Sequence, residues 1–243
     1  MYFPDDTLAY LRGEKYINAL PISFIYDDQD YRFRTQIEVL CEIAADTKII
    51  HLGCVDHNID TVRHKLQRRK WLHARLCESA RRCFGIDIEE EGIGYMRDKL
   101  GYTDCACMDV FSEEFETVAR SDDWDALFIP EVLEHIEAPR EFLARIAEKY
   151  RQHFNRLILT VPNGLSRDNY LLAKRGQEVI NSDHRFWFSP YTLAKCVVGA
   201  GLDIEEIRMC RHGTINWRAI RRNRFYRKYP LLRNDILCQA RFR

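Results

Sequence analysis

Hydrophobic and polar residues alternate along the chain in two periods, one typical of buried strands and one of amphipathic helices. Short runs rich in Ile, Val, Leu and Cys predict seven strands, over residues 48–52, 82–86, 104–108, 125–129, 157–161, 202–209 and 235–240. Apolar residues three and four positions apart predict helices over residues 33–45, 71–81, 89–100, 139–154 and 190–200. Strands and helices that alternate with short connections predict right-handed βαβ units and a parallel sheet.

These elements predict one domain over residues 1–243, because no linker rich in Pro, Gly or Ser divides the chain. We expect an α/β fold: a single Rossmann-like, doubly wound, mostly parallel seven-stranded sheet, with helices on both faces and an N-terminal helical cap. The cap corresponds to residues 1–32. We expect residues 162–189 to form a loop beside an acceptor site and residues 210–234 to form a basic insertion before the last strand.

Composition indicates a globular protein, because 46% of the residues are hydrophobic and 30% are charged. No apolar run approaches the roughly 18 residues that a membrane span needs, and acids near the N-terminus argue against a signal peptide. The nine cysteines form no CxxC pair, as expected of reduced thiols in a cytoplasmic protein. Cys105 and Cys107 fall on one face of a predicted strand, where ordinary packing is favoured over a metal role.

Positive charge is concentrated near the C-terminus, although the formal net charge is +0. From Arg208 onward Asp235 is the only acid among many arginines. Such a segment could attract a phosphate-rich or acidic partner. The alternative is favoured: these arginines form a solvent-exposed surface that balances the acidic middle of the chain.

Polar residues and a glycine follow successive predicted strands, where a doubly wound sheet binds its ligand. Gly53, after the first strand, lets the backbone approach a ligand closely. Asp87 ends the second strand and could accept hydrogen bonds from a ribose diol. Asp109 ends the third strand and could accept one from an adenine amino group. Each aspartate alone could instead be a helix cap, but the three features in order favour a nucleoside site.

The series KIIHLGC, CFGIDIEE, CACMDVF, WDALFIPEVLEHIEAP and LILTVPN resembles the motif series of class I S-adenosylmethionine-dependent methyltransferases. The resemblance covers roughly residues 33–209, and DILCQARF near the C-terminus looks like the last strand of that family. The element from Glu131 to Pro139 resembles the branch that includes ubiquinone-biosynthesis O-methyltransferases and methyltransferases of sugars and small metabolites.

The resemblance implies S-adenosyl-L-methionine as cofactor. It implies that the cofactor-binding positions are His51, Gly53, Val55, Asp87, Ile88, Asp109, Val110 and Ile129. Two departures stand out: His51 replaces an acid usual in the family, and Val55 and His57 replace glycines. The spacing from Gly53 to Asp87 is also longer than usual, and the basic stretch of residues 63–70 is expected to be an added loop.

Acids and histidines that could act in transfer follow the fourth and fifth strands. Glu131, Glu134 and His135 would share one face of a helix that began there, a spacing suited to metal ligation. His184 lies in the segment NSDHRFWFSP, where methyltransferases build the acceptor pocket. His135 and His184 are the candidate catalytic residues. The alternative is that Glu134 and His135 cap or pack the helix start.

Glu131, Glu134, His135 and His184 together make an adequate ligand set for Mg, Mn or Zn, similar to that of small-RNA 3′-terminal methyltransferases. Such an ion would make a vicinal diol the natural acceptor. The leading hypothesis is therefore O-methylation of a sugar or other small hydroxylated metabolite. RNA as acceptor is a less favoured alternative, because no nucleic-acid-binding module is evident. The third hypothesis is a non-catalytic protein that binds S-adenosylmethionine.

Overall fold

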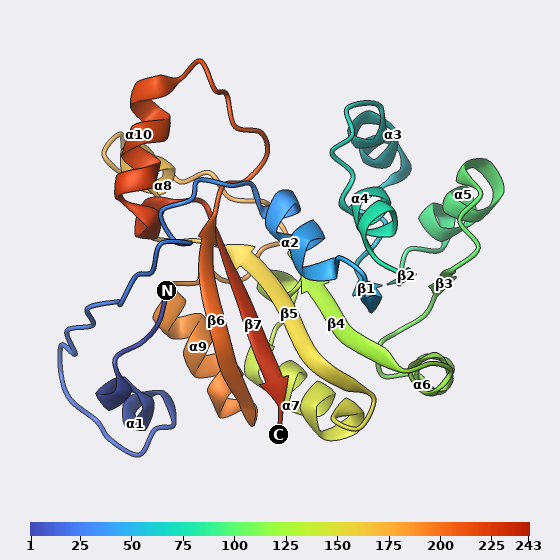
Figure 1. Ribbon diagram of the computed structural model, residues 1–243, viewed down its shortest axis with the longest axis horizontal. Helices are drawn as coiled ribbons and strands as arrows, with labels where there is room; N and C mark the ends of the chain where they lie inside the picture. The colour runs from blue at the N-terminus through green and yellow to red at the C-terminus, as the bar shows by residue number, and fades with distance from the viewer.

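A computed structural model describes all residues, 1–243, and contains one seven-stranded sheet (Figure 1). The strands are β1 (Lys48–Leu52), β2 (Arg82–Asp87), β3 (Cys105–Cys107), β4 (Trp124–Pro130), β5 (Phe154–Pro162), β6 (Leu202–Cys210) and β7 (Asp235–Phe242). Their order is β3-β2-β1-β4-β5-β7-β6. The pairs among β1 to β5 are parallel, and β7 is antiparallel to both β5 and β6. The predicted doubly wound sheet is confirmed, and its strand order reverses between β1 and β4.

Helices cover both faces of the sheet, also as predicted. They are α1 (Leu8–Leu11), α2 (Gln36–Ala44), α3 (Ile59–Gln67), α4 (Leu72–Ser79), α5 (Glu90–Leu100), α6 (Glu113–Arg120), α7 (Pro139–Tyr150), α8 (Arg167–Ala173), α9 (Pro190–Gly199) and α10 (Ile220–Lys228). Local capping fixes several starts: Thr35 and Glu38 form a capping box before α2, and Ser189 precedes Pro190 at the first turn of α9. The predicted helix 139–154 ends earlier, at Tyr150, because Phe154 already enters β5.

Alternate residues of the central strands pack into two separate cores. Ile49 of β1 joins a cluster with Leu40 of α2 and Leu76 of α4. The next residue, Ile50, joins a larger cluster on the opposite face, to which α7 and α9 contribute Leu143 and Leu193. Because neighbouring side chains of a strand point to opposite faces, β1 separates the α2/α4 side from the α7/α9 side.

The N-terminal segment lies along the outer edge of the sheet. The amino group of Met1 donates to the carbonyl of Ile207 in edge strand β6 over 3.0 Å and pairs with Asp30 at 2.8 Å. Lys195 of α9 donates to the carbonyl of Tyr10 over 3.3 Å. Residues 1–32 therefore cover the β6 edge, and only α1 and the 3-10 turn Asp5–Thr7 are helical.

Two segments expected to be loops, and the expected basic insertion, contain helices. Residues 63–70 fall largely within α3, residues 162–189 contain α8, and residues 210–234 contain α10. Helices α3 and α10 are dominated by polar residues, so the apolar stripe that reveals a helix is reduced to single buried positions such as Val62 in α3 and Tyr226 in α10, and α8 buries no residue. The sequence pattern also missed α6. None of the helices has the length and apolar composition that crossing a membrane requires.

Candidate functional site

The loop after β1 turns sharply at Gly53. Its φ of +80° is one that glycine adopts readily, and a Cβ at this position would lie only 2.9 Å from Cγ2 of Val132. The amides of Gly53 and Cys54 both donate to the carbonyl of Ile86, over 2.9 and 3.3 Å. The loop therefore folds over the end of β2, at the carboxyl edge of the sheet where the cofactor was expected.

Asp87 holds this loop in place. Its Oδ2 accepts from the amide of Val55 over 2.8 Å and its Oδ1 from the amide of Glu89 over 3.1 Å. Burial raises the pKa of the Asp87 carboxyl above its ordinary value. Each carboxylate oxygen can accept a further hydrogen bond, so the group can hold the loop and still receive ribose hydroxyls. Ile88 beside it is 76% exposed and offers an apolar surface to an adenine ring.

The remaining predicted cofactor positions differ in exposure. The Asp109 side chain is exposed, and its Oδ1 accepts from the amide of Phe111 over 2.7 Å. Val110 and Ile129 are buried. Asp109 can therefore meet a ligand directly, whereas the side chains of Val110 and Ile129 belong to the hydrophobic core.

The unusual residues His51 and Val55 are both buried. Val55 packs toward α5, where a Cβ on Gly92 would lie 2.2 Å from its Cγ1. Nδ1 of His51 lies 3.1 Å from Nδ1 of His73 in α4. The Val55 side chain thus does not obstruct the ligand edge, and a cofactor contact from either residue would come from its backbone.

Three residues after β4 and β5 converge on one point. Glu134 and His135 lie in a 3-10 turn, Leu133–His135, instead of the α-helix that the spacing suggested. His184 approaches from the loop before α9, with its Nε2 3.9 Å from Oε1 of Glu134. The rings of His135 and His184 are perpendicular with centroids 4.6 Å apart. One donor atom from each of the three lies within 4.8 Å of the others.

Glu134 is a buried carboxylate without a hydrogen-bond donor. The residue is 0% exposed, and neither of its oxygens has a partner; Nδ1 of His184 also lacks one. Burial raises the pKa of Glu134 to about 9, and burial with the neighbouring His135 lowers the pKa of His184. An unpartnered buried carboxyl group is costly. One carboxylate and two imidazoles are a donor set that fits a divalent cation.

Glu131 does not join this trio. Its Oε1 accepts from Gln36 Nε2 over 2.8 Å and from Thr160 Oγ1 over 2.9 Å, and its backbone adopts a φ of +54°, which is strained for a non-glycine residue. It forms a second group with His212 and Asp235, with one donor atom from each within 4.8 Å of the others. The structure thus brings together three of the four predicted metal ligands and places Glu131 in a neighbouring group.

His57 and His212, beside the trio, were not assigned a role from the sequence, whereas Asp183 belongs to the segment expected to form the acceptor pocket. Oδ2 of Asp183 lies 2.9 Å from Nδ1 of His135, and the ring of His57 lies 6.3 Å from that of His135. Nδ1 of His212 lies 3.3 Å from Oδ2 of Asp235, and this neighbouring carboxylate raises the pKa of His212 to about 9. Of these three residues, only Asp183 could be associated with the site from the sequence, because it stands next to His184.

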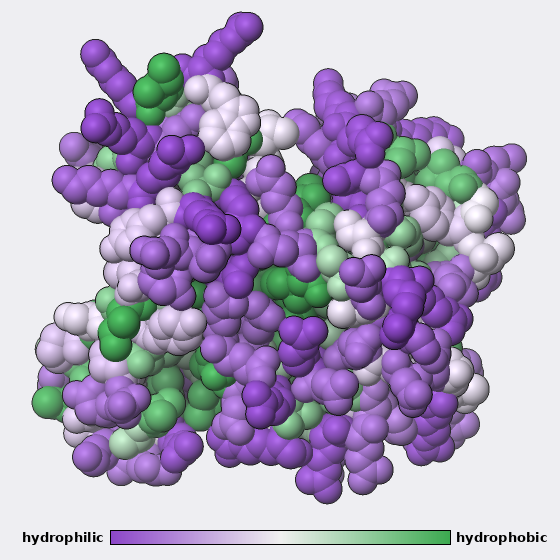
Figure 2. Space-filling model, in the orientation of Figure 1, coloured by the Kyte–Doolittle hydropathy of each residue, from purple (hydrophilic) through white to green (hydrophobic).

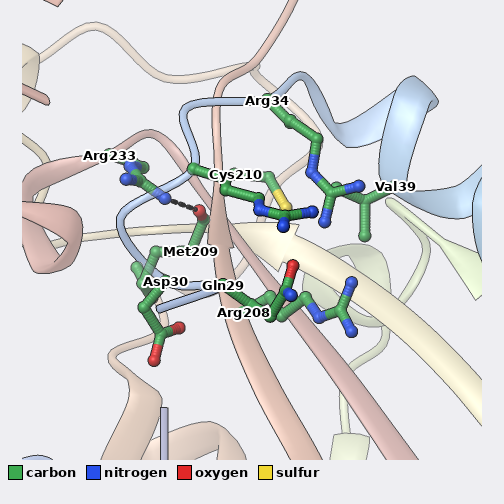
Figure 3. Close-up of a pocket in the computed structure, with 9 residues that line it drawn as sticks. Gln29, Asp30, Arg34, Val39, Arg208, Met209, Cys210 and Arg233 are labelled. Carbon is green, nitrogen blue, oxygen red and sulfur yellow. Dashed lines mark hydrogen bonds between the residues drawn. The ribbon is translucent and has the colours of Figure 1, made fainter. Parts of the chain in front are cut away.

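An arginine-lined cavity lies apart from this site, beside β6 and the segment before α2 (Figure 3). Its walls include Arg34, Arg208 and Arg233. Its volume of about 10 Å³ leaves room for roughly one water molecule. It is too small to hold the cofactor.

The C-terminal arginines fall into two groups. Arg208, Arg211, Arg241 and Arg243 form ion pairs with nearby acids. Five other arginines and Lys228 are exposed and have no carboxylate oxygen within 4.0 Å, whereas Arg233 is buried; this α10 basic surface comprises Arg218, Arg221, Arg222, Arg224, Arg227 and Lys228. Trp217 beside them is 61% exposed. Figure 2 shows hydrophilic side chains over the α10 and α3 lobes, with a notch between the lobes.

Comparisons with known proteins show what the chain is similar to. No protein-family model matches the sequence, and a search among curated proteins finds no significant relative. The solved structure of the small RNA methyltransferase HEN1 superposes with a TM-score of 0.53 at 14% identity, over 94% of this chain and 27% of that one. The chain therefore spans only about a quarter of HEN1.

Two other structures match over most of both chains. A protein from Listeria monocytogenes, named as an S-adenosylmethionine-dependent methyltransferase, has a TM-score of 0.52 at 9% identity and covers 86% of this chain and 95% of its own. A methyltransferase in complex with its Trm112 activator from Haloferax volcanii has a TM-score of 0.50 at 16% identity, over 84% and 87% of the two chains. At such identities the likeness concerns the fold, and the chain has the fold of the class I S-adenosylmethionine-dependent methyltransferases.

Proposed function

We propose that the protein is an S-adenosylmethionine-dependent O-methyltransferase whose acceptor is a vicinal diol held by a divalent cation. The observation that carries the proposal is Glu134, a fully buried carboxylate without a donor that faces His184 and lies beside His135. A cation between the three would supply the missing positive charge. Glu131 and its neighbours Gln36 and Thr160 would lie behind this site.

The cofactor would lie along the carboxyl ends of β1, β2 and β3. Asp87 would accept from the ribose hydroxyls, Ile88 would lie against the adenine, and Asp109 would accept from the adenine amino group. The sulfonium methyl group is already activated, so the protein must mainly hold an acceptor oxygen in line with it. Gly53 lets the loop backbone pass close to the methionine part of the cofactor.

Magnesium, manganese or zinc in the trio would bind the acceptor hydroxyls and lower their pKa. The chain's own residues orient the donors. Asp183 holds Nδ1 of His135, which leaves Nε2 for the ligand side. The amide of Arg185 donates to the carbonyl of Glu134 over 2.8 Å and ties the His184 loop to the 3-10 turn. His184, whose pKa is lowered, stays neutral at physiological pH, which is the form in which an imidazole binds a cation.

The α10 basic surface favours the terminal ribose of an RNA strand over the free sugar or small metabolite that the sequence favoured. Six exposed cations without acidic partners repel one another, a cost that a phosphate backbone would relieve. The exposed Trp217 offers a face on which a base can stack. The 3′-terminal ribose carries a vicinal 2′,3′ diol, the acceptor chemistry inferred for the trio.

The segment before α10 reaches the Glu131 group next to the trio, and the segment before α3 reaches the trio itself. His212, eight residues before α10, lies within 4.8 Å of Glu131, and His57, just before α3, lies beside His135. On the α3 side, Arg68 is exposed and has no acidic partner. A strand that lay across α10 could therefore end near His184.

Transfer of a labelled methyl group to short RNAs tests the acceptor. We expect transfer to an oligonucleotide with a 2′,3′ diol, and none to the same strand ending in a 2′-deoxyribose or a 3′-phosphate. Free ribose and small saccharides are compared at the same concentration. Transfer to saccharides alone would replace RNA by a small acceptor, and no transfer to any diol would contradict the proposed function.

The role of the α10 surface is tested by binding. The variant Arg221→Ala/Arg222→Ala/Arg224→Ala should reduce the salt dependence of RNA affinity by about 2 in log–log slope, because each lost phosphate contact contributes about 0.7 for a single strand. The matched control, Arg241→Ala/Arg243→Ala, removes arginines that are already paired with acids. An equal loss per arginine removed in both variants would show that total charge, and not this surface, attracts the RNA.

A further inference from the structure

A second cluster of metal-ligand types lies on the other side of the cofactor loop, under α4. His73 and Cys77 are four residues apart in α4 and therefore share one face of the helix. Cys83 lies opposite them, near the start of β2. One donor atom from each of the three residues lies within 4.8 Å of the others. None of them belongs to the cofactor loop or to the Glu134 trio.

The spacing of the donors suits one small ion. Nε2 of His73 lies 3.6 Å from Sγ of Cys77. Zinc bonds of about 2.3 Å to sulfur and about 2.0 Å to nitrogen place such a pair roughly 3.6 Å apart in a tetrahedral site. Sγ of Cys83 lies 3.9 Å from the other ring nitrogen of His73. His73 and Cys83 are buried, whereas Cys77 is half-buried and gives an ion a route from solvent.

His51 supports this arrangement from β1. Its Nδ1 lies 3.1 Å from Nδ1 of His73, so one ring nitrogen of His73 is held by a hydrogen bond and Nε2 faces Cys77. Metal-binding histidines commonly have their second nitrogen held in this way. The imidazole at position 51, unexpected in the sequence, thus has a partner in α4.

Gly85 makes room for the cluster. A Cβ at this position would lie 2.7 Å from Cε1 of His73 and 2.9 Å from Sγ of Cys54. Because neither the buried ring nor the strand backbone can yield easily, a larger residue would push α4 away from β2. Strand β2 therefore packs against the His73 ring at a distance that only a residue without a side chain permits.

We propose that His73, Cys77 and Cys83 bind one thiophilic divalent cation of the zinc type, with His51 orienting His73. Two thiolates and an imidazole select zinc over magnesium or manganese. Binding replaces the thiol protons of Cys77 and Cys83, which pass to solvent. The ion would clamp α4 to β2, directly beneath the loop that carries Cys54 and Val55.

Metal titration of the reduced protein under anaerobic conditions tests the site. The background variant Glu134→Gln/His184→Ala removes two donors of the other cluster, so that the two sites are distinguished. We expect one zinc per chain, and with cobalt a thiolate-to-metal charge-transfer band. Cys77→Ser and Cys83→Ser should each weaken the band, and the double variant should abolish it. Cys196→Ser, which changes a half-buried thiol in α9, is the matched control and should retain it.

Two further measurements guard against misfolded variants. In the unmodified protein, zinc should protect Cys77 from a thiol-alkylating reagent and raise the melting temperature. His51→Phe keeps a ring of similar size but removes its hydrogen bond, and should weaken zinc affinity by about 10–100-fold while retaining the cobalt band. Absence of zinc binding by the reduced unmodified protein, or a cobalt band that survives in the double variant Cys77→Ser/Cys83→Ser, would overturn the proposal.

Discussion

The Glu134–His135–His184 cluster and the His73–Cys77–Cys83 cluster are built from similar parts but lie in different settings. In the first cluster the rings of His135 and His184 are in contact, and in the second the ring of His73 contacts that of His51. In the first, the side chains of His135 and His184 remain 24% and 12% exposed. In the second, His73 is 0% exposed. The first is formed by loops at the carboxyl edge, and the second by a helix and a strand.

This difference separates two kinds of metal chemistry. An oxygen and nitrogen donor set that reaches solvent suits an ion that also binds an acceptor, because catalytic sites keep an open position. A sulfur-containing set enclosed between α4 and β2 suits an ion that only joins two elements. The two proposals thus assign methyl transfer to the Glu134 cluster at the strand ends and a structural ion to the contact between α4 and β2.

The largest expected effect follows from His184→Ala. Methyl transfer should fall by about 10²–10⁴-fold, the usual contribution of a positioned catalytic group, while zinc content at the His73 cluster stays unchanged. His64→Ala, which alters an exposed histidine of α3, is the control and should transfer methyl groups normally. Comparable activity in both variants would remove His184 from the site and leave the two clusters undistinguished.

An intermediate effect is expected from Asp87→Ala, a change at the last residue of β2. Loss of the carboxylate should weaken S-adenosylmethionine binding by roughly tenfold to a hundredfold, as measured by calorimetry, because about 1–3 kcal/mol of hydrogen bonding is lost. The melting temperature should also fall, since Asp87 holds the amides of Val55 and Glu89. Unchanged affinity would exclude Asp87 from the cofactor site.

The smallest effect concerns the pH dependence of stability without added metal. The folded-state pKa of Glu134 is raised to about 9 from an ordinary value of 4.5. Between these two values the unfolded chain is ionised and the folded one is not. The free energy of unfolding should therefore decrease as pH rises, by up to about 1.4 kcal/mol per pH unit.

Magnesium or manganese should flatten this decrease, because a cation favours the carboxylate. Glu134→Gln should flatten it without any ion, whereas zinc in the sulfur cluster should raise the melting temperature more strongly as pH rises, because its binding releases the thiol protons. Melting curves recorded between pH 5 and about pH 9 measure both effects. A slope that persists in Glu134→Gln would assign the proton uptake to another group.

Most of the sheet could be predicted from the sequence, because a buried parallel strand needs a continuous apolar run. The range 48–52 of β1 agrees with the structure, and β2 differs only by the addition of Asp87. Helices with a clear apolar stripe, such as α9, were found for the same reason. Helices α3 and α10 were missed because their charged residues leave only isolated buried positions.

For the candidate site, the sequence determined the types of residue that follow each strand: Gly53, Asp87, Asp109 and the acids and histidines after β4. Only the tertiary structure decided which of them meet. In the folded protein, Glu131 accepts hydrogen bonds from Gln36 and Thr160. Nδ1 of His51 lies against Nδ1 of His73. The physical reason is that side-chain contacts across a sheet depend on how loops and helices from distant parts of the chain pack, and no local pattern of residues specifies that packing.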